Sequence, residues 1–181
     1  MSLEVVIGPM FSGKSTYALS YVRRQHSIGK NVLIVKPNID TRYSTQNVLI
    51  THDREQIPCI LWDVNTPLDS SNKLFVNIDS IVFEEAQFFK NLYLCVRSLL
   101  LEQFKDIMVV GLDGDASQQT FGEVIDCIPW SSKVTKLNAY CSVCKDGTLA
   151  PYTKRKNAEN HTEQVCVGGP DMYEAVCLDH L

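Results

Sequence analysis

Residues 8–15, GPMFSGKS, fit the pattern G-x-x-x-x-G-K-[ST] of a phosphate-binding loop. Glycines let the backbone curl so that its N–H groups point at phosphate oxygens. Lys14 can then reach the β- and γ-phosphates of ATP, and the Ser15 hydroxyl can ligate Mg²⁺. A glycine-rich turn without a ligand is the alternative, which the apolar strand before the loop and the helical segment after it disfavour. The expected phosphate contacts come from Gly8, Pro9, Met10, Phe11, Ser12, Gly13, Lys14, Ser15 and Thr16.

Two adjacent acids, Glu84 and Glu85, close an apolar segment predicted to be a strand over residues 79–85. In phosphate-loop enzymes, an acid at the carboxyl end of a strand supports Mg²⁺. Because successive strand residues point to opposite faces, we expect one acid, Glu84, to serve the metal and the other to face the substrate. A carboxylate there could accept the proton of an attacking hydroxyl. An exposed pair of acids without a role is the alternative.

Cysteine and histidine form two close pairs near the end of the chain, Cys141-x-x-Cys144 and Cys177-x-x-His180. Three thiolates and one imidazole make a closed tetrahedral zinc site, with no position left for catalysis. We therefore predict structural Zn²⁺. Two alternatives stay open: the cysteines pack in a core, or His180 frays near the last residue. The remaining cysteines lie in apolar settings typical of packing: Cys59, Cys95, Cys127 and Cys166.

The segments that position these groups alternate between strands and helices. Apolar, β-branched runs predict strands over residues 5–7, 31–36, 79–85 and 107–112. Helical spacing and capping signals predict helices over residues 16–28, ending before Gly29, and 90–105. The polar residues 37–53 predict a surface loop. Near-continuous apolar strands alternating with helices indicate an α/β fold with a parallel sheet covered on both faces.

The composition of the sequence changes after about residue 134, where polar residues become frequent and the two pairs of cysteine and histidine residues occur. We predict a phosphate-loop, nucleotide-binding α/β domain over residues 1–136 and a small zinc-binding domain over residues 137–181. The 181 residues carry a net charge of −4, which argues against nucleic acid or a membrane surface as a partner. Residues 1–4 resemble no signal peptide, so we expect a cytoplasmic protein.

Seven segments together resemble the thymidine kinase family of the phosphate-loop, zinc-containing type, found in animals, bacteria and large DNA viruses. They follow the family's order along the whole chain: GPMFSGKST (8–16), DTRYS (40–44), THDR (51–54), EAQFF (85–89), GLDGD (111–115), YTKRK (152–156) and GGPDMY (168–173). The resemblance implies ATP-dependent phosphorylation of the 5′-hydroxyl of thymidine, with deoxyuridine also accepted. The products would be thymidine monophosphate and ADP, in nucleoside salvage for DNA synthesis. It also implies a homotetramer that uses ATP, Mg²⁺ and structural Zn²⁺.

The resemblance implies roles for individual residues. Glu85 corresponds to the general base, and Arg42 to an arginine near the transferring phosphate, where Lys14 also acts. Residues 147–168 resemble the family's lasso, a loop that closes over the thymine. The implied nucleoside contacts are Met10, Asp40, Phe88, Leu112, Phe121, Thr153, Gly168 and Tyr173.

The chain departs from the family pattern at three positions. Glu84 stands where the family usually has Asp, His180 replaces the usual fourth cysteine, and Ala116 stands where some relatives carry an aromatic pocket residue. A different class of function also stays open, a nucleotide-binding switch or nucleic-acid-binding module with a zinc ribbon. That class predicts a basic face, but YTKRK is the only basic cluster. Deoxycytidine and deoxyguanosine remain alternative substrates.

Overall fold

The computed structural model describes residues 1–39, 48–50, 56–156, 164 and 168–181. Its centre is a six-stranded sheet in the order β5-β2-β6-β7-β1-β8, in which every neighbouring pair is parallel. The predicted α/β class is therefore confirmed. The strands of this sheet are β1 (Ser2–Ile7), β2 (Val32–Pro37), β5 (Ile60–Trp62), β6 (Ser80–Phe83), β7 (Asp106–Gly111) and β8 (Lys133–Lys136).

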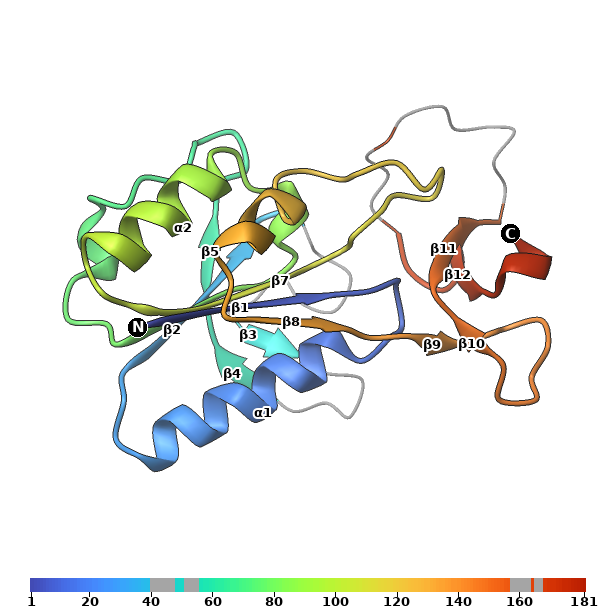
Figure 1. The fold of residues 1–181 in the computed structure, drawn as a ribbon, viewed down its shortest axis with the longest axis horizontal. Coiled ribbons are helices and arrows are strands. Elements are labelled where there is room, and N and C mark those ends of the chain that lie inside the picture. Colours follow the sequence, from blue (N-terminus) through green and yellow to red (C-terminus); the bar gives the residue numbers. More distant parts are fainter. Residues whose placement is uncertain (40–47, 51–55, 157–163, 165–167) are drawn as a thin grey trace.

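Two helices cover the two faces of this sheet, α1 (Lys14–Ser27) and α2 (Leu92–Leu101). They lie on opposite sides of it in Figure 1. Alternate strand residues explain this arrangement, because Val6 packs in one buried cluster with Leu19 of α1 and Val5 in another with Leu99 of α2. The sheet is thus held between two apolar layers, one on each face.

A small lobe extends beyond one end of the sheet and carries the C-terminus, while the N-terminus lies at the opposite end (Figure 1). Within it, β9 pairs antiparallel with β10, and β11 pairs with β12. Apart from these, β3 pairs antiparallel with β4. The bounds of these strands are β3 (Val48–Ile50), β4 (Gln56–Pro58), β9 (Ala139–Tyr140), β10 (Leu149–Ala150), β11 (Tyr152–Arg155) and β12 (Tyr173–Val176). β8 ends at Lys136, beside the domain boundary predicted from the sequence.

The sequence predictions need three corrections. The acidic strand ends at Phe83, so Glu84 and Glu85 do not alternate within a strand. The chain instead leaves the sheet there and enters a 3₁₀ turn over Ala86–Phe88, with Glu85 left-handed at φ 52°. α1 begins at Lys14, two residues before the predicted start, because the phosphate loop leads directly into it. Part of the predicted surface loop, β3, pairs with β4.

Among the described residues, no helix combines the length and the apolar character that crossing a bilayer requires. The predicted site residues Asp40 and Arg42 lie outside the described residues, as does Cys166.

Candidate active site and metal centre

The phosphate loop connects the carboxyl end of β1 to the first turn of α1. Gly8 has φ 149°, and a Cβ at this position would lie 2.3 Å from the Leu137 carbonyl oxygen. Only glycine therefore lets the backbone turn here without a steric clash. The Lys14 side chain is buried and its Nζ donates to the Pro9 carbonyl at 2.6 Å, while Ser12 Oγ donates to the same carbonyl at 2.8 Å. The loop is thus curled around its own lysine.

Glu84 lies directly beneath the loop and is only 2% exposed. Its Oε1 accepts a hydrogen bond from Ser15 Oγ, and its Oε2 accepts one from the Glu85 backbone N–H at 2.6 Å. Burial, reinforced by the neighbouring Glu85 charge, raises the pKa of Glu84 to about 7. A divalent cation at this carboxylate would oppose that shift, because it favours the charged form. The predicted Mg²⁺ pair, Ser15 and Glu84, is thus in direct contact.

Glu85 follows at the turn out of the sheet. Its Oε2 accepts a hydrogen bond from Gln87 Nε2 at 2.7 Å. The two adjacent acids therefore have different surroundings, one buried under the phosphate loop and one paired with an amide. The left-handed backbone at Glu85, not strand alternation, separates them.

An apolar cluster lies next to these acids. Met10, Leu112, Phe121 and Tyr173 are buried together, and Phe88 packs against them. The Phe88 and Phe121 rings meet edge to face, with centroids 5.3 Å apart and an interplanar angle of 83°. Partly buried neighbours of the cluster are Phe11, Ala116 and Met172. Five predicted nucleoside contacts thus come together from distant parts of the chain.

The small lobe touches the phosphate loop through Thr153, whose Oγ1 accepts a hydrogen bond from the Met10 backbone N–H at 3.0 Å. Also on β11, the Arg155 guanidinium donates to the hydroxyl of Tyr173 on β12 at 3.0 Å. It lies over the Tyr173 ring, 5.5 Å from the ring centroid. Gly168 packs against Met172, whose Sδ would lie 2.4 Å from a Cβ at that position. These contacts place β11 and β12 against the phosphate loop and the apolar cluster.

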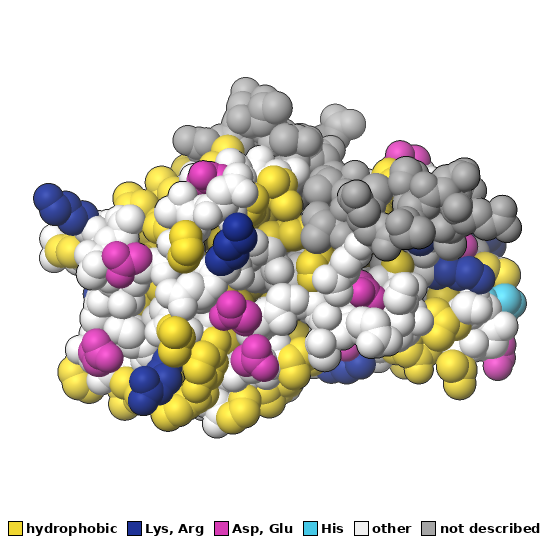
Figure 2. Space-filling model, turned by 90° about the horizontal axis from the view of Figure 1, so that it is seen from above, with side chains coloured by type: hydrophobic (Ala, Val, Ile, Leu, Met, Phe, Trp, Pro, Cys, Tyr) yellow, Lys and Arg dark blue, Asp and Glu magenta, His cyan; other side chains and the backbone are white. Residues whose placement is uncertain are grey.

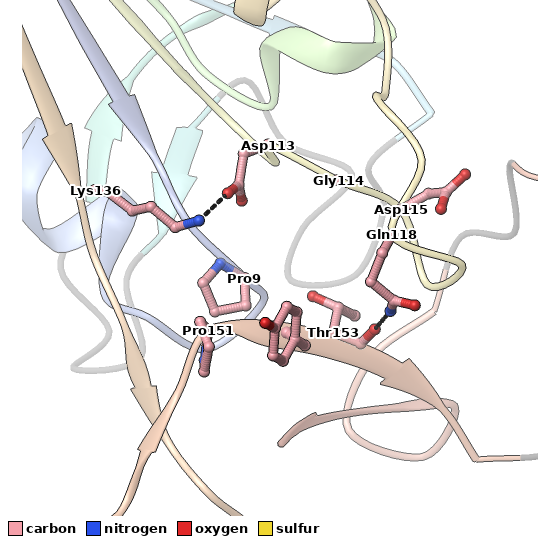
Figure 3. Close-up of a pocket in the computed structure, with 9 residues that line it drawn as sticks. Pro9, Asp113, Gly114, Asp115, Gln118, Lys136, Pro151 and Thr153 are labelled. Atoms are coloured by element: carbon pink, nitrogen blue, oxygen red, sulfur yellow. Dashed lines mark hydrogen bonds and ion pairs between the residues drawn. The ribbon is translucent and has the colours of Figure 1, made fainter. Parts of the chain in front are cut away.

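A cavity of about 200 Å³ lies where the small lobe meets the sheet domain. Figure 3 shows its walls, with Pro9 from the phosphate loop, Thr153 from β11, and Asp113 paired with Lys136 at 2.8 Å. Gln118 Nε2 donates to the Thr153 carbonyl across it at 3.4 Å. The Asp113–Lys136 ion pair therefore gives the cavity a charged wall, and the Gln118–Thr153 hydrogen bond joins two of its lining segments.

The four predicted zinc ligands come together at the C-terminal end of the small lobe. The Sγ atoms of Cys141, Cys144 and Cys177 and a ring nitrogen of His180 all lie within 4.8 Å of one another. Two sulfurs bound to one zinc at about 2.3 Å each are about 3.8 Å apart in a tetrahedral site. The Sγ atoms of Cys144 and Cys177 are 3.7 Å apart.

His180 turns its Nδ1 toward the sulfurs, at 3.2 Å from the Cys177 Sγ and 3.4 Å from the Cys144 Sγ. Backbone N–H groups, that of Cys144 first, lower the pKa of the Cys141 thiol to about 6, whereas desolvation and the neighbouring thiols raise the pKa of Cys144 to about 11. A thiolate is the form that binds metal. Distances and donor chemistry therefore both fit Zn²⁺. The cysteines predicted to pack are buried apart from this cluster, with Cys59, Cys95 and Cys127 between 1% and 5% exposed.

Sequence reasoning gave no role to Gln87, although it lies two residues after Glu85. Its side chain is 3% exposed, and its amide bridges Glu85 to the end of β7. The available signal was a polar residue within the otherwise apolar run AQFF. Met172 and Arg155 were also missed, and Phe11 was assigned only to the phosphates, since nothing local marks these residues as neighbours of the cluster.

Comparison with known proteins agrees with this geometry. The model of the thymidine kinase family matches residues 1–181. Thymidine kinase a of Arabidopsis thaliana is 40% identical, over 99% of this chain and 74% of that protein. The cytosolic thymidine kinase of Gallus gallus is 37% identical, over 97% of this chain and 74% of that protein. The thymidine kinase of Choristoneura fumiferana entomopoxvirus is 34% identical, over 98% of this chain and 94% of that protein. This chain belongs to the thymidine kinase family.

Proposed function

We propose that this chain transfers the γ-phosphate of ATP to the 5′-hydroxyl of thymidine, giving thymidine monophosphate and ADP. Deoxyuridine is accepted as well, because it differs from thymidine only in one methyl group. The observation that carries the proposal is the contact between Ser15 and Glu84. It brings the phosphate loop to the turn that holds Glu85, and the apolar cluster lies beside both.

In the proposed reaction, the 5′-oxygen forms a bond to the γ-phosphorus as the bond from that phosphorus to the β,γ-bridging oxygen breaks. Glu85 accepts the proton of the 5′-hydroxyl, and ADP leaves. Lys14 exchanges its contact with the Pro9 carbonyl for phosphate oxygens, where it offsets their charge. Arg42, by family resemblance, acts at the same phosphate, and Asp40 in the same loop contacts the nucleoside.

Mg²⁺ and Zn²⁺ have separate places in this proposal. Ser15 and Glu84 would hold Mg²⁺, which would offset the negative charge of the phosphates. The glutamate replaces the aspartate usual in the family, and its contact with Ser15 supports its reaching the metal position. Cys141, Cys144, Cys177 and His180 would hold Zn²⁺ as a structural ion, remote from the transferred group.

The base would bind in the apolar cluster. Phe88 and Phe121 offer ring faces and edges, while Met10 and Leu112 fill the remaining sides. The lasso would supply Thr153 and Gly168, and Tyr173 would come from β12 of the same small lobe. A small pyrimidine suits this set better than a purine, and Ala116 leaves that part of the cluster thinner than an aromatic residue would.

The function is tested by initial rates of ATP consumption with thymidine, deoxyuridine, deoxycytidine and deoxyguanosine. We expect thymidine and deoxyuridine to be the best acceptors. A preference for deoxyguanosine would contradict the base assignment. ATP hydrolysis unaffected by any nucleoside would instead favour a nucleotide-binding switch.

The roles of the two acids are tested with Glu84→Gln and Glu85→Gln. Loss of a general base typically costs on the order of 10²–10⁴ in rate, so Glu85→Gln should lower kcat by that amount at every Mg²⁺ concentration. Glu84→Gln should raise the Mg²⁺ concentration needed for half-maximal rate and recover partly in excess Mg²⁺. Rescue of the Glu85 variant alone would show that the roles are reversed.

The remaining proposals concern assembly and surroundings. The family resemblance supports a homotetramer, which light scattering of the purified protein tests. "Cytosolic" in the names of the animal relatives supports a cytoplasmic location. On the face shown in Figure 2, the described Lys and Arg side chains are spread among acidic ones rather than gathered in one patch. That distribution supports small-molecule partners over nucleic acid.

A further inference from the structure

We propose that Gln87 is a positioning residue, which holds the Glu85 carboxylate at a fixed place relative to the end of β7. This inference rests on the proposed function, because it presupposes that Glu85 is the base. Gln87 itself is not proposed to touch the substrate. It would act through the hydrogen bond from its Nε2 to Glu85 Oε2, which measures 2.7 Å.

The backbone fixes which way the Gln87 amide points. Leu112 N–H can only donate, and it donates to Gln87 Oε1 at 3.1 Å. The other end of the amide must therefore be the –NH₂ group, and it faces Glu85. As a result, the backbone N–H of Leu112, the residue after β7, determines that the Glu85 carboxylate receives a donor and not another acceptor.

The surroundings of Gln87 leave it little room to move. A Cβ at Gly111 would lie 2.8 Å from Gln87 Oε1 and 2.9 Å from Val124 Cγ2. A Cβ at Gly122 would lie 2.2 Å from the Gln87 carbonyl oxygen. Two glycines are thus in close contact with one buried glutamine, and each would displace it if it carried a side chain.

A fixed carboxylate matters here because Glu85 has a left-handed backbone, at φ 52°, just outside the sheet. Strand pairing does not hold it there. Proton transfer requires the base within hydrogen-bonding reach of the hydroxyl, and a misplacement of about 1 Å can cost on the order of 10²-fold in rate. The Gln87 bridge connects this residue to β7, a central strand.

Two substitutions separate the two halves of the amide. Gln87→Met keeps the length and removes both hydrogen bonds. Gln87→Glu keeps an acceptor for Leu112 N–H but replaces the donor to Glu85 with a second carboxylate, which repels the first. We expect both to lower kcat by about 10- to 100-fold. Gln87→Glu should leave the KM for thymidine within about threefold, since Leu112 in the nucleoside cluster keeps its partner.

A double-mutant cycle with Glu85→Gln distinguishes positioning from a general structural fault. If Gln87 acts through Glu85, then Gln87→Met should change kcat by less than about threefold in the Glu85→Gln background. Thermal melting of each variant verifies folding. Fully additive losses, or a kcat within threefold of wild type in a folded Gln87→Met variant, would overturn the inference. Near-normal activity of Glu85→Gln alone would instead refute the proposed base.

Discussion

We expect the hydrogen bond between Thr153 of the small lobe and Met10 of the phosphate loop to contribute measurably to thermal stability. Thr153→Val keeps the shape of the side chain and removes the Oγ1 acceptor of the Met10 N–H. Thr153 is 5% exposed, so water cannot easily replace the lost partner. A buried donor left unsatisfied costs about 1–3 kcal/mol. For a domain of this size, that corresponds to a fall in Tm of about 2–12 °C.

The local consequence is sharper than the change in Tm. Exchange of the Met10 amide proton requires a local opening that breaks its hydrogen bond. If the substitution makes this opening of the phosphate loop easier by the same 1–3 kcal/mol, the proton should exchange with solvent about 5- to 150-fold faster. Amide hydrogen exchange by NMR measures this directly. Thr153→Ser is the matched control: it keeps the hydroxyl and loses about 0.8 kcal/mol of methyl burial. Equal protection of the Met10 amide in the valine and serine variants would refute the reasoning.

Two further predictions concern the metal centre and the N-terminal end of the central strand β7. Cys144→Ser should lose zinc and thermal stability together, since metal affinity is coupled to folding; zinc-free wild-type protein on metal analysis would contradict it. Burial opposes ionisation of Asp106, but hydrogen bonds from Lys30 and Ser2 outweigh this and lower its pKa below 3.8. The carboxylate therefore adds stability above the ordinary pKa, which is lost as pH falls through the lowered one. In urea unfolding, Asp106→Asn should cost up to about 1 kcal/mol at pH 7, and this cost should shrink as the pH falls through the lowered pKa; a cost that does not change with pH would exclude this linkage.

The phosphate loop and the zinc cluster could be predicted from sequence because their chemistry is local. Gly8, Gly13 and Lys14 lie within one short loop, and each pair of expected ligands, Cys141 with Cys144 and Cys177 with His180, is three residues apart. The central strands were also predictable, since buried parallel strands are near-continuous apolar runs. β5 was not predicted, because at three residues it is too short to show a pattern. β8 was also missed, since its two lysines flank Val134 and Thr135 in an exposed edge strand that shows neither an apolar run nor alternation.

The placement of the two acids could not be derived from sequence. Alternation along a strand was a reasonable premise, but it fails when the chain leaves the sheet at Phe83. Positive φ at Glu85 carries no sequence signal, because glutamate is not a residue that favours the left-handed region. The role of Gln87 depends on that turn and on the distant Leu112, 25 residues away. Contacts of this kind exist only once the tertiary structure is formed.

The phosphate loop is held from two sides by distant parts of the chain. Ser15 contacts Glu84 at the end of β6, and Met10 contacts Thr153 on β11, 143 residues further along. β11 pairs in turn with β12, where Thr153 lies opposite Ala175, two residues before the first ligand of the second zinc pair. By the proposed assignment, a zinc ion bound to this cluster would therefore also order one wall of the phosphate site. It would not need to approach the transferred phosphate to influence the proposed reaction, because strand pairing and one buried hydrogen bond connect the two sites.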